Sequence, residues 1–295
     1  MKKIILLLLL TNSFVLAYGQ EIEENIEEII QDKHEEYYSN GNLKEYCDYD
    51  EDEKLTGTWT SYYENGQIKE KGNYSKDKKV GEWKYYHKNK EIAAIGKWKE
   101  GKAIGRWVYY GENGKMSSVG EWKNGKSNGL WKYFYKEGGV ESVSEFKEGK
   151  PDGIEERYYE SGKIKTRGTF KQGKRVGVWK NYYDNGMIHQ ELQYEDDRLD
   201  GVFKEYYKDK QLKYEGVLSK GKRIGVWKRY YKEGKIYQKL RYKNDDFIEI
   251  VLCVDKKGKT LDKGTYYNGN GTVKEYDENG ELIKVMNFEN FIEQE

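Results

Sequence analysis

The sequence predicts an all-β fold, an elongated array of antiparallel β-hairpins that forms a single twisted sheet with short caps at its ends. Three observations predict it: a repeat, a hairpin-turn signal at one place in the repeat, and strand-forming residues on both sides of that turn. A fixed period of this length is typical of a solenoid, whose units bury a core only by stacking. The repeat appears as a glycine at every 24th position: Gly57, Gly81, Gly105, Gly129, Gly153, Gly177, Gly201 and Gly225.

Three further columns of similar residues follow each glycine. Two positions after it comes an aromatic residue, from Trp59 to Trp227, with Glu155 as the exception. Eleven positions after it comes an apolar residue, from Ile68 to Ile236. Five positions after it comes a fully aromatic column, which is the candidate binding stripe: Tyr62, Tyr86, Tyr110, Phe134, Tyr158, Tyr182, Tyr206 and Tyr230.

Residues 57–80 show how one unit forms a hairpin. The stretch from Thr58 to Tyr63 is rich in β-forming residues, and a second strand runs from Gln67 to Tyr74. Between them, Asn65-Gly66 favours a two-residue type I′ turn, because both central residues of that turn need a positive φ. The copies that lack the glycine, Asn89-Lys90 and Asp209-Lys210, should have strained or shifted turns.

A two-residue turn fixes which residues face each other. The expected pairs on one face are Tyr63–Ile68, Ser61–Glu70, Trp59–Gly72 and Gly57–Tyr74. Each large ring at the last two levels would cover a glycine, which leaves room for it.

The same register raises two difficulties. Leu192 and Leu240 stand where Trp179 and Trp227 would need a glycine, so the fit there must differ. It also places Tyr62 on the polar face. Either Tyr62 belongs to an exposed stripe, or a bulge near the turn rotates its ring inward. Between hairpins, the stretch from Ser75 to Val80 is expected to be a return loop with a charged rim.

The ends of the chain differ from the array. Residues 1–19 have the layout of a secretory signal peptide: two lysines, an apolar run and small residues before a cut that leaves Gln20 first. Residues 20–36 form an acidic N-terminal arm or cap helix. The array covers residues 37–288 in about ten units, and residues 289–295 form a C-terminal tail. A secreted or periplasmic location in the cell envelope follows from the signal.

Composition narrows the classes of partner. Lys and Arg number 53 against 52 Asp and Glu, so no field attracts nucleic acid or an anionic membrane. No later apolar run is long enough for a membrane span, so membrane insertion after signal cleavage is not expected. Cys47 and Cys253 lie about eight repeats apart, too far in an extended array for a disulfide.

No residue pattern predicts catalysis, a cofactor or a metal. His34, His87 and His189 occupy different repeat columns, and no catalytic or phosphate-binding motif is present. The expectation is therefore a binding protein and not an enzyme. Its rings have two interpretations: the Trp59 and Tyr74 columns form the core of the array, or part of them is an open platform for sugar rings or a peptide.

The unit Gly-x-Trp-x-x-Tyr-Tyr-x-Asn-Gly-x-Ile resembles the bacterial variant of the MORN repeat, most cleanly at 57–74, 105–126 and 177–194. The resemblance implies a meander of β-hairpins. Proteins of this variant are often labelled antitoxin-like, which implies a protein partner. A looser likeness to cell-wall choline-binding repeats implies an aromatic platform. The leading hypothesis is thus an exported scaffold that binds a protein at the cell envelope, antitoxin-like in the family's terms. The alternative is a glycan or cell-wall binding module.

Overall fold

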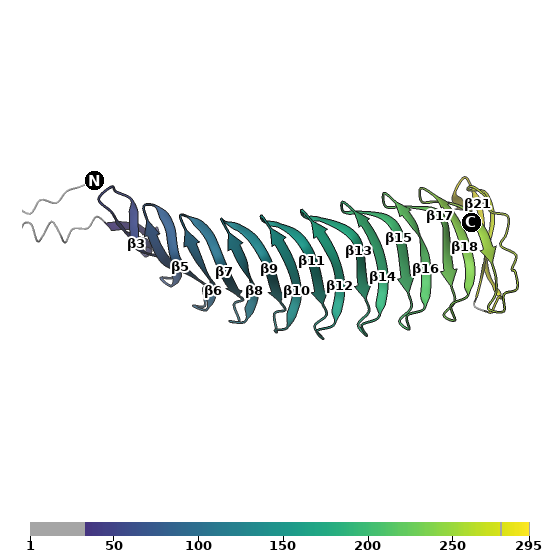
Figure 1. Cartoon of the computed structure of the whole chain (residues 1–295), viewed down its shortest axis with the longest axis horizontal. Helices are drawn as coiled ribbons and strands as arrows, with labels where there is room; N and C mark the ends of the chain where they lie inside the picture. The colour runs from purple at the N-terminus through teal and green to yellow at the C-terminus, as the bar shows by residue number, and fades with distance from the viewer. Residues whose placement is uncertain (1–32, 278, 295) are drawn as a thin grey trace, which may run out of the picture. The chain divides into compact units, whose positions relative to one another are not determined.

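The computed structural model describes residues 33–277 and 279–294, which form two antiparallel β-sheets (Figure 1). The first has 19 strands, which pair in chain order. The predicted all-β class and antiparallel hairpin array are confirmed. The strands are β1 (Lys33–Tyr37), β2 (Leu43–Tyr49), β3 (Leu55–Tyr62), β4 (Ile68–Ser75), β5 (Lys78–Tyr86), β6 (Ile92–Lys99), β7 (Lys102–Tyr110), β8 (Met116–Lys123), β9 (Lys126–Phe134), β10 (Val140–Lys147), β11 (Lys150–Tyr158), β12 (Ile164–Lys171), β13 (Lys174–Tyr182), β14 (Ile188–Glu195), β15 (Arg198–Tyr206), β16 (Leu212–Ser219), β17 (Lys222–Tyr230), β18 (Ile236–Lys243) and β19 (Asp246–Cys253).

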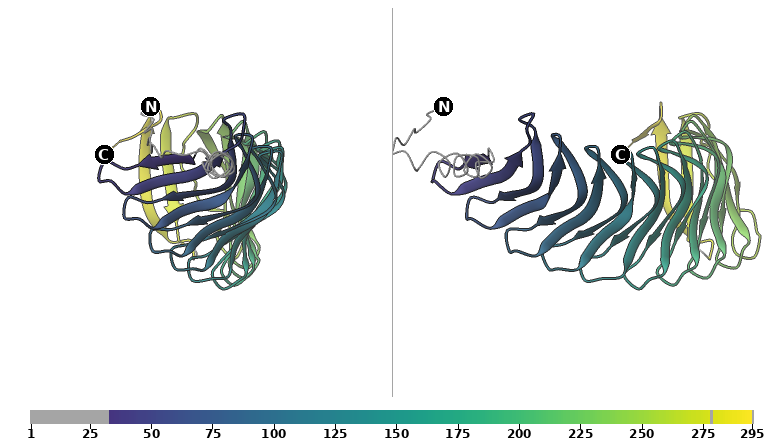
Figure 2. Two further views of the ribbon diagram at one scale, coloured as in Figure 1. Left: turned by 90° about the vertical axis from the view of Figure 1, so that its left-hand side faces the viewer. Right: turned by 60° about the vertical axis from the view of Figure 1, so that its left-hand side comes forward.

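The second sheet has three strands, β20 (Gly271–Tyr276), β21 (Leu282–Glu289) and β22 (Ile292–Gln294). Among the described residues, no helix is long and apolar enough to cross a membrane. The chain divides into two compact units, the first ending at Ala103 and the second beginning at Ile104. Within each unit, successive hairpins lie side by side (Figure 2).

The turn inside each hairpin differs from the prediction. Only Gly66 has a positive φ, of 80°, and its N–H donates to the Tyr63 carbonyl, while the Tyr63 N–H donates to the Gln67 carbonyl. This is a three-residue loop that ends on a glycine in the left-handed region. Three-residue hairpin loops commonly have this form, whereas type I′ turns belong to two-residue loops. The type I′ prediction for Asn65-Gly66 was therefore wrong. Lys90 and Lys210 keep the same turn with φ of 75° and 76°, so the predicted strain is present there.

The longer loop changes one predicted pair and leaves the others intact. Ile68 pairs with Tyr62 and not with Tyr63, and the register then shifts by one residue at Lys69. This bulge restores the predicted pairs Ser61–Glu70, Trp59–Gly72 and Gly57–Tyr74. Because the bulge lies in β4, the alternation of side chains along β3 from Trp59 to Tyr62 is unbroken. The bulge therefore exists, but it does not rotate Tyr62 inward as one of the two alternatives required.

The connections between hairpins contain the type I′ turns. Lys76 and Asp77 have φ of 49° and 63°, and Glu100-Gly101 has 50° and 73°. Positive φ at both central residues is the mark of a type I′ turn, whose twist matches that of the strands. The predicted return loop Ser75–Val80 thus shrinks to two residues, and the next strand begins at Lys78.

Alternation along the strands gives the sheet two faces. We call the side of Trp59, Trp83, Trp107, Trp131, Trp179 and Trp227 the tryptophan face, and these indoles are all buried. We call the other side the tyrosine face, because the column from Tyr62 to Tyr230 lies on it. In the described part of the chain, nine of the sixteen buried hydrophobic residues are aromatic, and six of these nine are the indoles of the tryptophan face.

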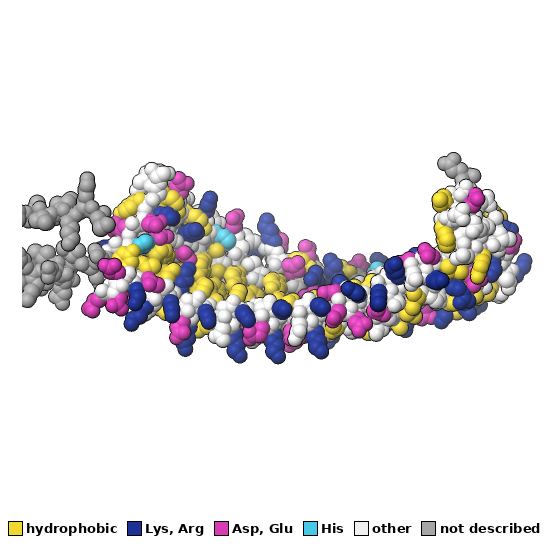
Figure 3. Space-filling model, turned by 90° about the horizontal axis from the view of Figure 1, so that it is seen from above, with side chains coloured by type: hydrophobic (Ala, Val, Ile, Leu, Met, Phe, Trp, Pro, Cys, Tyr) yellow, Lys and Arg dark blue, Asp and Glu magenta, His cyan; other side chains and the backbone are white. Residues whose placement is uncertain are grey.

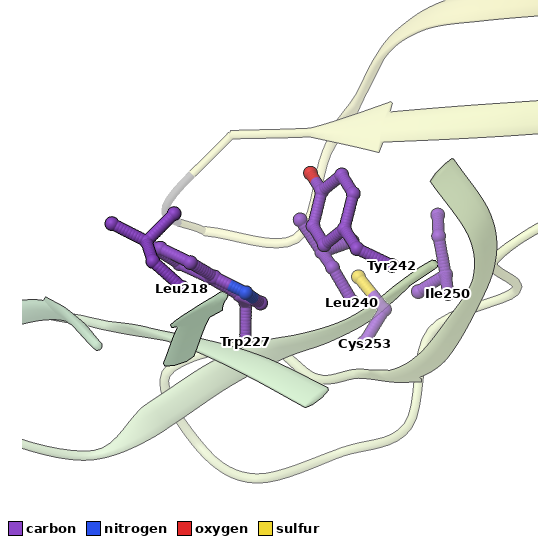
Figure 4. Packing of buried hydrophobic residues seen from close by; sticks show 6 residues of the cluster. All are labelled: Leu218, Trp227, Leu240, Tyr242, Ile250 and Cys253. Carbon is purple, nitrogen blue, oxygen red and sulfur yellow. The ribbon is translucent and has the colours of Figure 1, made fainter. Parts of the chain in front are cut away.

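At the C-terminal end of the second unit, the small sheet covers the tryptophan face. Leu218, Trp227, Leu240, Tyr242, Ile250 and Cys253 form a buried cluster there (Figure 4), and Val273 and Tyr276 of β20 pack against it. Both cysteines are free and buried. Two predicted boundaries change. Residues 33–36, placed in the N-terminal arm, belong to β1, and β22 lies within the predicted tail. The signal peptide and residues 20–32 lie outside the described residues.

Candidate functional site: the two faces of the sheet

The tryptophan face is closed by an interlock between neighbouring hairpins. A methyl group on Gly72 would lie 2.2 Å from Cδ2 of Trp83, so the ring that covers this glycine comes from the next hairpin and not from Trp59. The same contact joins Gly168 to Trp179, at 2.0 Å. The predicted opposition of ring and glycine is thus correct in kind, but its partners belong to adjacent repeats.

The interlock explains the two leucines that did not fit the predicted pairs. Trp179 and Trp227 do pair with Leu192 and Leu240, yet their rings lie over Gly168 and Gly216 of the preceding hairpins. The leucine affects the following hairpin instead.

After Leu192 the tryptophan position holds a phenylalanine, Phe203, which pairs with it. Where one hairpin has a glycine at this position, the next hairpin places a tryptophan over it. Where one hairpin has the larger Leu192, the next places the smaller ring of Phe203 opposite it.

Three of the six indoles, those of Trp83, Trp131 and Trp179, also donate a hydrogen bond to the strand beneath them. The indole N–H of Trp83 donates to the Asn73 carbonyl at 3.2 Å, and that of Trp179 donates to the Thr169 carbonyl at 3.3 Å. In the six hairpins with a tryptophan, the glycine two positions earlier has a φ of 63–71°. In the two hairpins without one, Gly153 and Gly201, φ is 135° and 117°. The ring and the backbone conformation thus change together.

The rings continue as a stack in the second unit. Trp107 stacks on Tyr109 with ring centroids 5.9 Å apart, Tyr109 on Trp131 at 6.0 Å, and Trp131 on Tyr133 at 6.2 Å. Tyr109 lies between the indole of its own hairpin and the indole of the next. This supports the interpretation of the rings as core.

The stack stops at hairpin β11–β12. The tryptophan position there holds Glu155, the tyrosine position holds Arg157, and the preceding glycine position holds Ser144. Glu155 is only 8% exposed; its carboxylate accepts from Arg157 Nε at 2.7 Å and from the Ser144 hydroxyl at 3.0 Å. A buried, paired carboxylate thus replaces the ring that would cover Tyr133.

Two adjacent recesses open on this face and share Glu155 and Arg157. The first, about 410 Å³, has Tyr133, Ser142 and Phe146 among its walls. The second, about 360 Å³, has Phe170, Trp179 and Tyr194.

The predicted stripe lies on the opposite, tyrosine face, where all eight side chains are half-buried. Three of its hydroxyl groups bind carboxylates of the same face: Tyr158 donates to Glu156, Tyr206 to Glu191 at 3.0 Å and Tyr230 to Glu215 at 2.7 Å. The hydrogen bond to Glu156, with burial, raises the pKa of Tyr158 to about 12. Burial and the Glu191 hydrogen bond raise the pKa of Tyr206 to about 12.

The neighbouring tyrosine column, one position later, joins the hairpins. The hydroxyl of Tyr159 donates to the Tyr182 carbonyl at 2.6 Å, and Tyr183 donates in the same way to Tyr206 at 2.7 Å. Tyr63, Tyr135, Tyr207 and Tyr231 repeat the bond to the next hairpin.

An exposed aliphatic stripe on the tyrosine face was missed by the sequence analysis. It occupies the position directly after the repeat glycine in four successive hairpins of the second unit. The exposed fractions are 55% for Leu130, 45% for Ile154, 52% for Val178 and 46% for Val202. The signal was available, because the same column holds Thr58, Glu82 and Arg106 in earlier repeats.

Charged side chains border hydrophobic ones on the surface of the protein. In Figure 3, hydrophobic side chains gather mainly in the left-hand half of the surface shown, and Lys and Arg side chains line its lower border. On the tyrosine face, Lys180 pairs with Glu191 at 3.0 Å and Lys228 with Glu215 at 2.9 Å.

One group of possible metal ligands occurs among the described residues: His34, Glu36 and Glu45 have ligand atoms within 4.8 Å of one another. Their partners are protein groups. His34 bonds Tyr49 at 2.8 Å and Glu45 at 2.9 Å, and Glu36 accepts from Lys44 at 2.6 Å. We therefore describe His34 as a satisfied histidine, which also stacks on Trp59.

Comparison with known proteins assigns the repeat. The model of the MORN repeat variant family matches seven stretches, residues 33–51, 55–76, 151–172, 175–196, 199–218, 223–244 and 269–290. No curated protein matches the chain.

Similar solved structures are far larger proteins. TcdB2-TccC3 is 10% identical with a TM-score of 0.19 over 86% of this chain, and a Tc holotoxin pore of Photorhabdus luminescens is 11% identical with a TM-score of 0.16 over 92%. This chain spans 17% and 18% of their lengths.

Proposed function

We propose that this chain, which belongs to the MORN repeat variant family, is an exported scaffold that binds a protein partner through the tyrosine face of its second unit. The observation that carries the proposal is the aliphatic stripe Leu130, Ile154, Val178 and Val202. Four exposed aliphatic side chains in line are an apolar surface of the kind that marks interaction sites.

The surroundings of the stripe suit a protein. Adjacent stripe residues are two strands apart, which is about 10 Å, so the line extends over roughly 30 Å. Half-buried tyrosines and Lys–Glu pairs such as Lys180–Glu191 flank it. Interfaces between proteins commonly combine an apolar centre, aromatic side chains and a polar rim.

Export is the second part of the proposal and rests on the signal peptide predicted at residues 1–19. The partner would then be a protein of the cell envelope. Identification of a toxin as the partner would add the antitoxin-like role; a partner of another kind would remove it.

The test is a pull-down from envelope extracts with the mature protein. The double variant Val178→Lys/Val202→Lys places two charges on the stripe and should lose the partner while the protein stays folded, because both residues are about half exposed. The control Glu82→Lys puts a lysine in the same column on a hairpin outside the stripe and should keep the partner. Equal recovery by all three proteins would refute the proposal.

A further inference from the structure

We propose that the break in the aromatic stack at Glu155 and Arg157 is a binding site for an oligosaccharide. It lies on the tryptophan face and is independent of the protein-binding proposal, which uses the opposite face. Three features of the structure point to it: a ring is missing from the stack, polar groups line the space it leaves, and two recesses continue the space along the sheet.

The first feature is the unfilled stacking position at Tyr133. In the preceding repeat, Tyr109 lies between Trp107 and Trp131, at 5.9 Å and 6.0 Å. Among the described residues, Tyr133 stacks on Trp131 alone, because the next tryptophan position holds Glu155. The Tyr133 ring lines the first recess, which leaves it available to a flat ligand with an apolar side.

The second feature is the set of polar groups around that position. Ser142 pairs across the sheet with Tyr133 on one side and with Arg157 on the other, so the three side chains lie in a row on the same face. Within the described part of the chain, Arg157 is bonded only through Nε, to Glu155, and no protein group bonds the hydroxyls of Tyr133 or Ser142. Arg157 is 60% exposed in its side chain, and its terminal nitrogens can donate to a ligand.

The buried Glu155 orients the side chain of Arg157 in this row. Its carboxylate is about nine-tenths buried and holds the guanidinium at 2.7 Å, which fixes the outward fork of Arg157. A carboxylate buried at this depth is costly to keep and is tolerated only with such partners. A tryptophan here would complete the stack, as it does in the neighbouring hairpins.

The aromatic ring of Tyr133 together with the polar groups beside it determines which class of ligand can bind. An aromatic side chain from a partner would fill the space but would bury Glu155 and Arg157 without new hydrogen bonds, which costs free energy. A strongly charged ligand is not favoured, because Glu141 and Glu155 oppose Arg157, Lys165 and Arg175 in the lining. A sugar ring offers an apolar side to Tyr133 and hydroxyl groups to Arg157 and Ser142.

The third feature is the combined length of the two recesses. The recesses of about 410 Å³ and 360 Å³ meet at Glu155 and Arg157, and the second has Phe170, Trp179 and Tyr194 among its walls. Rings thus stand on both sides of the polar pair. A chain of several sugar units can stack on both, whereas a single unit would use only one recess.

The experiment titrates the full-length mature protein with chitotetraose and with cellotetraose, followed by tryptophan fluorescence and calorimetry. We expect saturable binding of at least one of them. Arg157→Ala should weaken it by about tenfold or more, since it removes hydrogen bonds from a charged group. The control Arg229→Ala changes the same repeat column in another hairpin and should leave the affinity unchanged.

A second variant closes the site by restoring the interlock. Ser144→Gly/Glu155→Trp converts this hairpin to the pattern of Gly168 and Trp179, so it should fold and lose saccharide binding. If that variant does not fold, the Arg157→Ala result decides. The proposal is overturned if neither saccharide binds, if the closed variant binds as well as the wild type, or if Arg157→Ala instead abolishes capture of a protein from envelope extracts.

Discussion

The interlock between Gly168 and Trp179 predicts a specific rescue by a second substitution. Gly168→Leu places a Cβ 2.0 Å from Cδ2 of Trp179, where carbon atoms need about 3.5–4.0 Å, so the ring must move by about 1.5 Å or more. Overpacking of this kind costs about 3 kcal/mol at the upper end of the usual range. The backbone of Gly168 is outside the left-handed region, so the side chain and not the backbone carries the cost.

Trp179→Phe alone shortens the ring and removes the N–H that donates to the Thr169 carbonyl, at a cost of about 2 kcal/mol. Independent effects would add to about 5 kcal/mol. The double variant reproduces Leu192 followed by Phe203, a pair that this chain already contains, so it should cost only about 2–3 kcal/mol. The expected coupling is about 2 kcal/mol in favour of the double variant.

Urea and thermal unfolding, followed by circular dichroism, measure these differences. At about 2–4 °C per kcal/mol for a chain of this size, Gly168→Leu should lower Tm by about 6–12 °C, and the second substitution should recover part of this loss. The matched control is Ser144→Ala, in the same column but beneath no indole, which loses only its hydrogen bond to Glu155. Strict additivity of the two substitutions would refute the interlock.

Three further predictions follow from the backbone, the tyrosine hydroxyls and the period. Gly105→Val should lower Tm more than Lys99→Val, because Gly105 has a φ of 63° that valine rarely adopts, although no ring covers this glycine; equal Tm values would contradict it. The folded-state pKa of Tyr158, about 12, lies above its ordinary value of 10.0, so its hydrogen bond to Glu156 stabilises the fold fully below pH 10 and loses this contribution as pH rises toward 12; a phenolate absorbance titration in which Tyr158→Phe removes a group ionising near 10 would contradict this. Deletion of residues 105–128, one full period, should leave a cooperative fold. Deletion of 105–116 should not, because it joins non-equivalent strands and puts their rings on the wrong face of the sheet; identical melting of the two proteins would reject the repeat geometry.

Much of the fold could be predicted from the sequence because the repeat supplies eight versions of one hairpin. The period located the strands to within a few residues, and the pairs Trp59–Gly72 and Gly57–Tyr74 are as expected. The loop was mispredicted because Asn65-Gly66 satisfies both a type I′ turn and a three-residue loop that ends on glycine. One residue of loop length then decided whether Ile68 faces Tyr62 or Tyr63.

The contacts between hairpins were harder to foresee. Pairing within a hairpin follows from its turn, but the ring over Gly72 comes from the next hairpin, whose register depends on a second bulge at Gly81. A sequence signal did exist: Ser144 precedes Glu155 and Leu192 precedes Phe203, so the two deviations from the glycine–tryptophan pattern occur together. The recesses beside Glu155 follow from that deviation.

For the candidate stripe, the sequence located the column of rings but did not reveal the hydrogen bonds that their hydroxyl groups make. Tyr158, Tyr206 and Tyr230 lie on a face that carries exposed side chains, yet their hydroxyls are bonded to carboxylates of the same sheet. At these three of the eight positions, the aromatic residue is accounted for by bonding within the sheet. The more exposed groups are the aliphatic residues at the position after the repeat glycine, where composition changes along the array.

The central claim, that a protein partner binds the tyrosine face of the second unit, is tested most directly by site-specific photo-crosslinking. A photoreactive amino acid at Val178 or Val202, in the mature protein incubated with envelope extract, should give one discrete crosslinked species that is identified by mass spectrometry. The same group at Arg157, on the tryptophan face, should not give it. Crosslinks from Arg157 alone, with none from Val178 or Val202, would contradict the claim.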